Sequence, residues 1–194
     1  MKKIIDFAKN FDSTLWEQFQ NYLETTEDEL KDNYKGLNPQ EFICFPVVIV
    51  DNTIVCFSGL QTNKERWGTG IGRCSTRMWI HPDYRQPGMT KFTGGDKFLN
   101  TTYCLPLQLA AAKLNKLDCI FISRETNLTG FEQYLNLIKI NCNADFKLHP
   151  AKYNVCGSLK PVPHSCKQWV ATHYLTDSGN TKWAIQMGKF NNVL

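Results

Sequence analysis

The amino-acid sequence predicts an α/β fold with a mixed sheet, in which an antiparallel meander and a central parallel strand pair are flanked by helices. Three apolar strands in close succession, at residues 42–50, 53–58 and 74–80, indicate the meander. An apolar helix at about 105–115 then leads into the apolar strand 119–123. A strand, a helix and a strand in this order normally form a parallel pair with a right-handed crossover. The two patterns together predict the mixed sheet.

The N-terminal part of the chain supplies one strand and one helix. Residues 4–7 form a short apolar start, and residues 13–25 carry apolar side chains at helical spacing. These side chains are Leu15, Trp16, Phe19 and Leu23. Further on, Asp51 and Asn52 separate the first two strands of the meander and predict a tight hairpin turn.

The segments between and after these elements are less regular. Residues 62–72 are polar and rich in glycine, but their Gly-x-Gly-x-Gly pattern precedes a strand instead of following one. We therefore interpret them as a flexible loop and not as a dinucleotide site. A second helix is expected at 128–138, and two late strands are expected at 169–175 and 183–187.

Length and composition predict one soluble domain over residues 1–194. Of these residues, 42% are hydrophobic and 21% are charged, which is ordinary for a globular protein. The net charge of +4 is mild, and Lys and Arg do not cluster, so nucleic acid is not an expected partner. A signal-peptide core and an apolar run of about 20 residues are both missing. We expect a cytoplasmic protein with no membrane partner, and the sequence indicates no oligomeric state.

The eight cysteines predict reduced core thiols. No two of them are closer than ten positions, and several lie inside apolar strands, where free Cys behaves as a small buried hydrophobe. One group of side chains has the donor atoms of a zinc site: His149, Cys156, His164 and Cys166. Their spacing matches no compact zinc motif, so we expect no metal. A catalytic pair of Cys104 with a histidine has no better support.

Two motifs carry a resemblance to a known family. Arg85 and Gly88, separated by two residues, follow the apolar strand and a Pro-marked turn, and Asn127 precedes Tyr134 by seven positions. With the order of the elements, these motifs resemble the GCN5-related N-acetyltransferase (GNAT) family, which has the acyl-CoA N-acyltransferase fold. Its pyrophosphate loop reads Arg or Gln, two residues, Gly, one residue, then Gly or Ala. The match covers about residues 45–134 and is topological elsewhere.

The resemblance implies a parallel strand pair that splays apart and holds acetyl-CoA, or another acyl-CoA, as co-substrate. The backbone of residues 78–80 would hydrogen-bond the pantetheine and the acyl carbonyl, and N–H groups of residues 86–90 would hold the pyrophosphate. Tyr134 would donate a proton to the departing thiolate. The implied cofactor-binding residues are Met78, Trp79, Ile80, Arg85, Gln86, Pro87, Gly88, Met89, Thr90 and Asn127.

Each of these residues alone also has a structural explanation. The loop that begins at Arg85 contains ordinary turn residues, and Tyr134 alone would be a packing residue on a helix face. His81 precedes a proline in a turn and is more easily explained as structural than as catalytic. The sequence singles out no general base, because Glu65 and Asp83 are near only along the chain.

The sequence departs from the family pattern after the phosphate loop. Thr90 stands where the family usually has Gly or Ala, and its β-branched side chain narrows the space for a phosphate. Two glycines interrupt the helix that would follow, so we expect an insertion at about residues 91–103. Because Pro106 is tolerated mainly in a first helical turn, the main helix is expected to begin near residues 102–105.

The functional prediction is an N-acyltransferase that moves an acetyl or short acyl group from coenzyme A to an amine. The acceptor would be a small-molecule or peptide amine that attacks directly in a ternary complex. The alternative is a non-catalytic ligand-binding or interaction module of the same fold, in which the insertion alters or blocks the coenzyme A groove. A third possibility draws the acyl group from a carrier protein, for which the modest basic charge is weak support.

Overall fold

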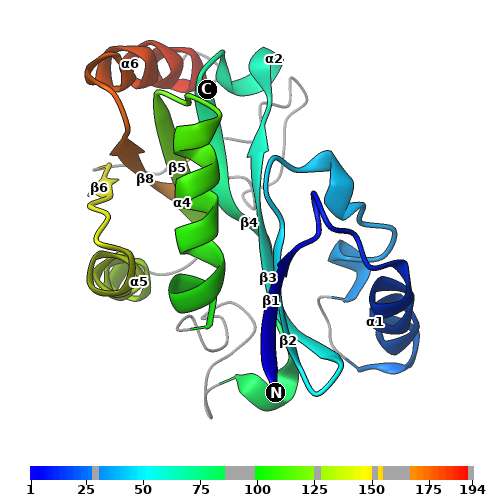
Figure 1. Cartoon of the computed structure of the whole chain (residues 1–194). Helices are drawn as coiled ribbons and strands as arrows, with labels where there is room; N and C mark the ends of the chain where they lie inside the picture. Colours follow the sequence, from blue (N-terminus) through cyan, green and yellow to red (C-terminus); the bar gives the residue numbers. More distant parts are fainter. Residues whose placement is uncertain (28–30, 86–98, 125–127, 150–152, 155–166, 192–194) are drawn as a thin grey trace. The chain divides into compact units, whose positions relative to one another are not determined.

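A computed structural model describes residues 1–27, 31–85, 99–124, 128–149, 153–154 and 167–191 (Figure 1). The tertiary contacts divide the chain into two compact units. The first unit contains residues 1–61 and 75–111, and the second contains residues 62–74 and 112–194. Strand β4, Ile71–Ile80, contributes residues to both units.

The sheet of the first unit is the predicted meander with one strand added. Strand β1, Lys2–Asp6, pairs antiparallel with β2, Pro46–Val50, and β2 pairs antiparallel with β3, Thr53–Thr62. Asp51 and Asn52 make the hairpin turn with φ angles of 47° and 61°, the left-handed pair that a tight type I′ turn requires. Strand β4 follows β3 in the sheet, so the predicted meander is confirmed.

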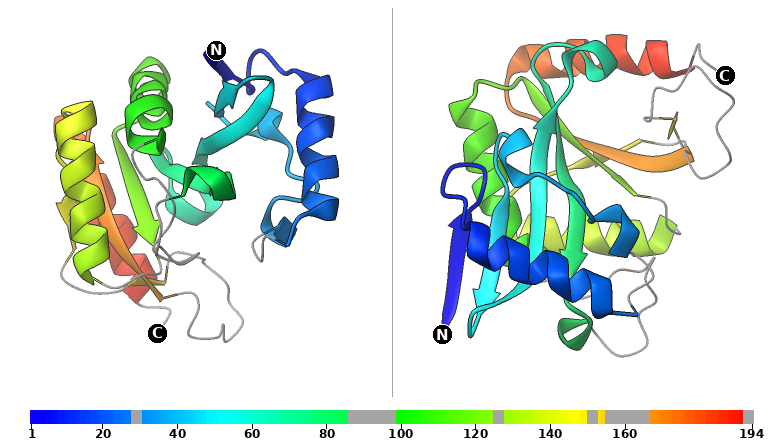
Figure 2. Two further views of the ribbon diagram at one scale, coloured as in Figure 1. Left: turned by 90° about the horizontal axis from the view of Figure 1, so that it is seen from below. Right: turned by 90° about the vertical axis from the view of Figure 1, so that its right-hand side faces the viewer.

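Helix α1, Ser13–Thr25, packs on one face of this sheet, as the right-hand view of Figure 2 shows. The helix has the bounds that the sequence predicts, and the side chain of Asp12 caps its first turn. An aromatic core lies beneath it. The core rings in contact with one another include Phe7, Trp16, Phe19, Phe45, Phe57 and Trp79. Large rings in mutual contact supply much of the buried apolar area of this unit.

The other face of the first unit is covered by the predicted helix, which a π-helical turn precedes. A five-residue π-helix, η4 at Asn100–Cys104, runs directly into α4, Leu105–Leu114. The α-helix itself begins at Leu105, within residues 102–105 as the sequence predicts, and the π-helix adds one turn before it. Pro106 lies in the helix because the wider π turn precedes it, and the N–H of Leu105 bonds back to the carbonyl of Asn100.

The second unit is built on a short parallel pair. Residues Ile71, Gly72 and Arg73 of β4 pair with the first three residues of β5, Cys119–Arg124. The pairing ends there, although both strands continue. Strand β5 pairs antiparallel over its whole length with β8, Lys167–Tyr174. The fold class is thus confirmed: a mixed sheet with one parallel pair and flanking helices.

The remaining elements of the second unit include one correction. Residues 183–187 lie in helix α6, Asp177–Asn191, so the late strand predicted there is wrong. Buried Gly179, Trp183 and Gln186 recur at helical spacing, and Trp183 packs against Phe121 of β5. The other elements are α5, Leu128–Cys142; β6, Lys147–Leu148; and β7, Tyr153–Asn154.

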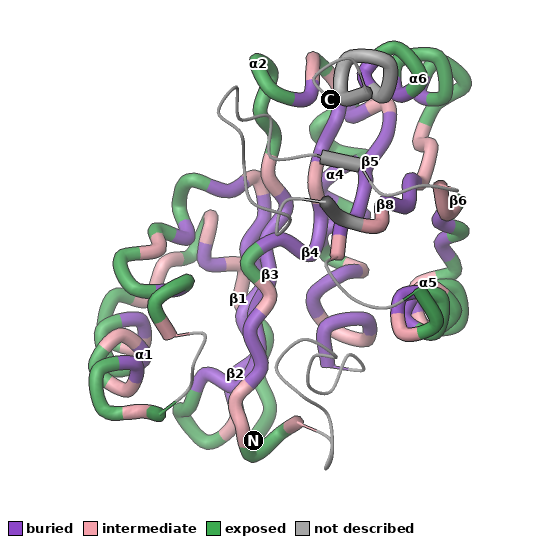
Figure 3. Tube along the Cα trace, turned by 180° about the vertical axis from the view of Figure 1, so that it is seen from behind, coloured by how far each residue is buried: buried purple, intermediate pink, exposed green. Residues whose placement is uncertain are grey.

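Short helical turns fill three of the connections. The predicted flexible loop at 62–72 contains helix α2, Lys64–Trp67, which the side chain of Asn63 caps and which buries Trp67. The turns in the first unit are η1, Lys31–Asn33; η2, Pro39–Glu41; and η3, Pro82–Tyr84. Figure 3 shows that buried residues follow the sheet strands, while green, exposed residues mark the outer sides of the helices. Within the described part of the chain, no helix could cross a membrane.

Candidate functional site

The C-terminal half of β4 has one side that faces away from β3. The N–H of His81, just after β4, donates to the carbonyl of Val55 at 2.8 Å, which ties this end of β4 to β3. Residues along an antiparallel pair point their backbone groups alternately toward the partner strand and away from it. The backbone N–H and C=O groups of Ile80 and Met78 therefore point away from β3. We call this side of Ser75–Ile80 the outer edge of β4.

Side chains from the first unit bind two carbonyls of the outer edge. The Tyr34 hydroxyl donates to the Met78 carbonyl at 2.7 Å, and Nε of Arg85 donates to the Ile80 carbonyl at 2.8 Å. Tyr34 is only 5% exposed, and its ring packs edge-on against Phe57. The two carbonyls thus lie where a polar donor can reach them.

The outer edge begins with a distortion of the backbone. Ser75 and Arg77 have φ angles of 51° and 50°, the left-handed region that side chains other than Gly, Asn and Asp avoid. Each such residue costs about 1–3 kcal/mol, and surrounding contacts must hold it in place. The guanidinium of Arg77 donates to the carbonyl of Asn33 in η1. The distortion follows directly after the three residue pairs with β5, and it explains why regular pairing stops there.

A closed ring of hydrogen bonds holds Ser75 from the α4 side. Its N–H donates to Oε1 of Gln108 at 2.8 Å, and Nε2 of Gln108 donates to the Ser58 hydroxyl at 2.7 Å. The Ser58 hydroxyl donates to Oδ1 of Asn100, whose Nδ2 donates to the Ser75 hydroxyl at 3.0 Å. All four side chains are 0% exposed. We call Ser58, Ser75, Asn100 and Gln108 the Ser75 ring.

The turn after β4 fixes the position of Arg85 and gives His81 a structural role. The imidazole Nδ1 of His81 accepts the N–H of Asp83 and caps η3, and its ring stacks on Tyr22 at 5.2 Å. His81 is thus structural, as expected. Arg85 lies at the end of η3 with Nε on the Ile80 carbonyl. The predicted pyrophosphate loop, residues 86–90, lies outside the described residues.

Two predicted site residues belong to the second unit. Tyr134 on α5 is 2% exposed, and the guanidinium of Arg124 lies 5.5 Å from the centre of its ring. Tyr134 is therefore not a surface side chain, and its hydroxyl belongs to a protected part of this unit. Asn127 lies outside the described residues.

The cysteines behave as core thiols where the structure describes them. Burial raises the pKa of Cys74 and of Cys119 to about 12 and that of Cys142 to about 11, so these thiols stay protonated at neutral pH. Cys104 is buried, and its thiol donates to the Pro46 carbonyl. Among the described residues, no three His, Cys, Asp or Glu side chains group as metal ligands. Cys156, His164 and Cys166 of the zinc hypothesis lie outside them.

His149, the remaining member of that hypothesis, has a packing role. Its Nε2 accepts the indole N–H of Trp183 at 2.7 Å and lies 3.0 Å from the hydroxyl of Thr172. Because an indole N–H can only donate, this nitrogen carries no proton in the native state. Burial lowers the pKa of His149 below its usual value.

The free energy of unfolding is expected to fall as the pH falls below about 6.5. The unfolded chain protonates His149 near that pH, whereas the folded chain resists protonation until the pH reaches its lowered pKa. Urea unfolding from pH 8 to pH 5 measures the slope. His149→Gln keeps an acceptor for Trp183 and should flatten the slope. An identical slope in wild type and His149→Gln would contradict this assignment.

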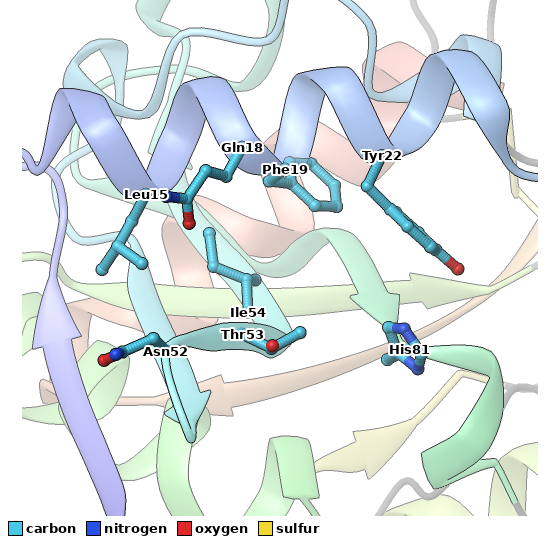
Figure 4. Close-up of a pocket in the computed structure, with 8 residues that line it drawn as sticks. All are labelled: Leu15, Gln18, Phe19, Tyr22, Asn52, Thr53, Ile54 and His81. Carbon is cyan, nitrogen blue, oxygen red and sulfur yellow. The ribbon is translucent and has the colours of Figure 1, made fainter.

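A separate hollow lies beneath α1, next to the β2–β3 hairpin (Figure 4). It encloses about 240 Å³ and has mostly apolar walls. The residues around it are Leu15, Gln18, Phe19, Tyr22, Asn52, Thr53, Ile54 and His81. Pockets that bind ligands usually enclose about 300–1,000 Å³. We therefore place the candidate site at the outer edge of β4 and not in this hollow.

The structure adds residues that the sequence did not indicate. Of the predicted set, it brings together Met78, Ile80 and Arg85, while Trp79 turns its side chain into the aromatic core. Tyr34 and the Ser75 ring were missed. A polar Gln108 between two leucines of an apolar helix was the one signal available for the ring. Nothing along the chain connects Tyr34 with a strand 44 positions away.

Solved structures with the same fold are acetyltransferases. A probable acetyltransferase from Staphylococcus epidermidis matches with a TM-score of 0.56 and 9% sequence identity, over 91% of this chain and 100% of that one. An acetyltransferase of the GNAT family from Streptococcus pneumoniae matches with a TM-score of 0.55 and 13% identity, over 90% and 100%. No family model and no curated protein matches the sequence. The chain therefore has the GNAT fold, as its motifs predict, in a divergent sequence.

Proposed function

We propose that this chain is an N-acyltransferase that moves an acetyl or short acyl group from coenzyme A to an amine. The observation that carries the proposal is the outer edge of β4, where Met78 and Ile80 direct their carbonyls away from β3 directly after a distorted turn of the strand. The fold shared with acetyltransferases supports the proposal. In this role, residues 1–194 act as one catalytic domain.

The residues of the outer edge fit a pantetheine arm. Pantetheine is an extended chain with two amides, and such a chain can add to a strand edge through backbone hydrogen bonds. The carbonyls of Met78 and Ile80 already accept hydrogen bonds from side chains of the protein, so hydrogen-bond donors reach them. In the proposal, the backbone of residues 78–80 binds the pantetheine and the acyl carbonyl.

Arg85 and the residues after it are proposed to bind the pyrophosphate. Nε of Arg85 is fixed on the Ile80 carbonyl, so the positive charge of its guanidinium stays at the end of β4. The N–H groups of residues 86–90 would complete this site, and Asn127 would contact the bound cofactor. Thr90 leaves less room for a phosphate than a glycine would. We therefore expect the pyrophosphate to contribute less to the affinity for acyl-CoA than it would beside a glycine.

Tyr134 is proposed as the general acid. Coenzyme A, when bound, supplies a thioester. In the proposal, the amine nitrogen would form a bond to the thioester carbonyl carbon, the bond from this carbon to sulfur would break, and the amine would give one proton to solvent. Tyr134 gives its hydroxyl proton to the departing sulfur, and solvent returns it. The low exposure of Tyr134 supports this role, because a packed ring holds its hydroxyl in one position.

The acceptor is proposed to be the amine of a small molecule or a peptide, and the protein is proposed to act in the cytoplasm. The mild net charge supports an acceptor other than nucleic acid. The fold relatives are named as acetyltransferases, which supports acetyl as the transferred group. No metal takes part in the proposed chemistry, because amine attack on a thioester needs only positioning and a proton donor.

Calorimetric titration with acetyl-CoA tests the proposal. We expect binding with a micromolar dissociation constant, and thiol release when a panel of primary amines and N-terminal peptides is added. Coenzyme A without its acyl group should bind and give no transfer, which makes it the control. The absence of heat and of a thermal shift at millimolar acetyl-CoA would contradict the proposal and favour a non-catalytic module. Transfer from an acylated carrier protein alone would identify a different donor.

A further inference from the structure

The Ser75 ring combines three unusual features. It is a polar network with no exposed member, it holds a serine in the left-handed region, and Asn100 enters it from a π-helix. Apolar side chains of similar size would pack such a position without the loss of hydration. Strained backbone and π turns are frequent at functional sites. All three features meet at Ser75, where the outer edge of β4 begins.

One backbone group fixes the orientation of the Gln108 amide in the ring. The N–H of Ser75 can only donate, so Gln108 must turn its oxygen toward it and its NH₂ toward Ser58. The Ser58 hydroxyl then donates to Asn100, which is left with an NH₂ for the Ser75 hydroxyl. A flip of the Gln108 amide would bring two donors together at the Ser75 N–H. The ring holds Ser75 at both its N–H and its side chain.

We propose that Gln108 and Asn100 are positioning residues for acyl transfer. They hold Ser75 in its left-handed conformation. They thereby fix the backbone path of the outer edge, and this edge aligns the acyl carbonyl. This inference rests on the proposed function, because it assigns the ring to the same edge. Neither side chain touches the reacting atoms, so each acts only through β4.

Three variants measure the effect. Gln108→Leu removes the acceptor of the Ser75 N–H and is expected to lower kcat/KM for acetyl-CoA by about 100-fold, mainly in kcat, since misplacement by about 1 Å has effects of this size. Asn100→Asp keeps the shape but loses the NH₂ group, and we expect a fall of about 10-fold. Gln186→Leu is the matched control. Gln186 is another buried glutamine, 6% exposed, that donates to the Arg66 carbonyl at 2.7 Å.

The control separates positioning from stability. Gln108→Leu and Gln186→Leu each remove a buried amide, so both are expected to lower the melting temperature. Only the first is expected to change the kinetics of the folded protein, and the second should stay within about twofold of wild type. Equal kinetics for the two variants would overturn the inference. If Gln108→Leu fails to fold, Asn100→Asp against the same control decides the question.

A second measurement needs no coenzyme A. Amide hydrogen exchange of residues 75–80 in the free protein should be faster in Gln108→Leu than in Gln186→Leu when both are corrected for global stability. Unchanged exchange there would overturn the positioning role even if acyl transfer is observed. The two proposals can also fail separately. If wild type does not bind acetyl-CoA but Gln108→Leu still speeds amide exchange at residues 75–80, the proposed function is wrong. The conclusion that the Ser75 ring holds the outer edge in place would then remain.

Discussion

Replacing Tyr134 by phenylalanine is expected to lower kcat for acyl transfer by at least about 100-fold, with KM for acetyl-CoA within about threefold of wild type. The change removes only the hydroxyl that we propose to protonate the departing thiolate. The ring remains, so its packing and its contact with the guanidinium of Arg124 are retained. Steady-state release of free thiol from acetyl-CoA, measured with a fixed amine acceptor, gives both constants.

A second tyrosine of the same unit provides the control. Tyr174 also carries a cation over its ring, with Nζ of Lys147 at 5.4 Å from the ring centre. Tyr174→Phe is expected to leave kcat unchanged. Equal kcat values for Tyr134→Phe and wild type would show that Tyr134 is a packing residue and not the acid.

Replacing Phe57 by alanine is expected to lower the free energy of unfolding by about 3–5 kcal/mol. Phe57 is 0% exposed and lies at the centre of the aromatic core beneath α1. Five rings have their centres within 5.2–5.6 Å of its own: Trp16, Phe19, Tyr34, Phe45 and Trp79. Because these rings are large and interlocked, they cannot close the cavity that the substitution leaves. Urea unfolding followed by circular dichroism measures the difference.

Phe11→Ala tests whether the centre of the cluster matters more than its rim. Phe11 is half-buried and makes one edge-on ring contact, with Phe7 at 5.8 Å. We expect its loss to lower the free energy of unfolding by about 1 kcal/mol. A change below about 2 kcal/mol for Phe57→Ala would contradict the central role of this ring.

The local elements could be predicted because their signals lie close together along the chain. The spacing of Trp16, Phe19 and Leu23 fixes the face of α1, and Asp51 and Asn52 fix the hairpin because both tolerate left-handed backbone. The strand, helix and strand around residue 105 correctly predicted the parallel pair. These patterns, with the motif at Arg85, were sufficient to predict the fold.

The predicted late strand is wrong because tertiary contacts override local preference there. Residues 183–187 contain Trp183 and Ile185, which favour strands, but the chain is helical because Trp183 packs on Phe121 and Gln186 donates to Arg66. Neither contact leaves a mark in the local sequence. The π-helix before Leu105 was likewise not predicted, although the start of the α-helix was.

The candidate site was only partly predictable for a similar reason. Met78 and Ile80 could be proposed from a resemblance in sequence, but Tyr34 meets Met78 across 44 positions and Gln108 meets Ser75 across 33. A polar side chain in an apolar helix indicates that it has a partner and does not say which one. The left-handed φ angle of Ser75, which the ring maintains, appears only in the folded chain.

Hydrogen exchange of the outer edge with and without saturating acetyl-CoA tests the central claim most directly. We predict that amide exchange of residues 75–80 slows by about tenfold or more when acetyl-CoA is present, because the pantetheine adds to this edge. Strand β2, Pro46–Val50, should exchange at the same rate in both samples and serves as the internal reference. Acetyl-CoA that binds while exchange at residues 75–80 stays unchanged would contradict the claim that the outer edge of β4 is the acyl-CoA site.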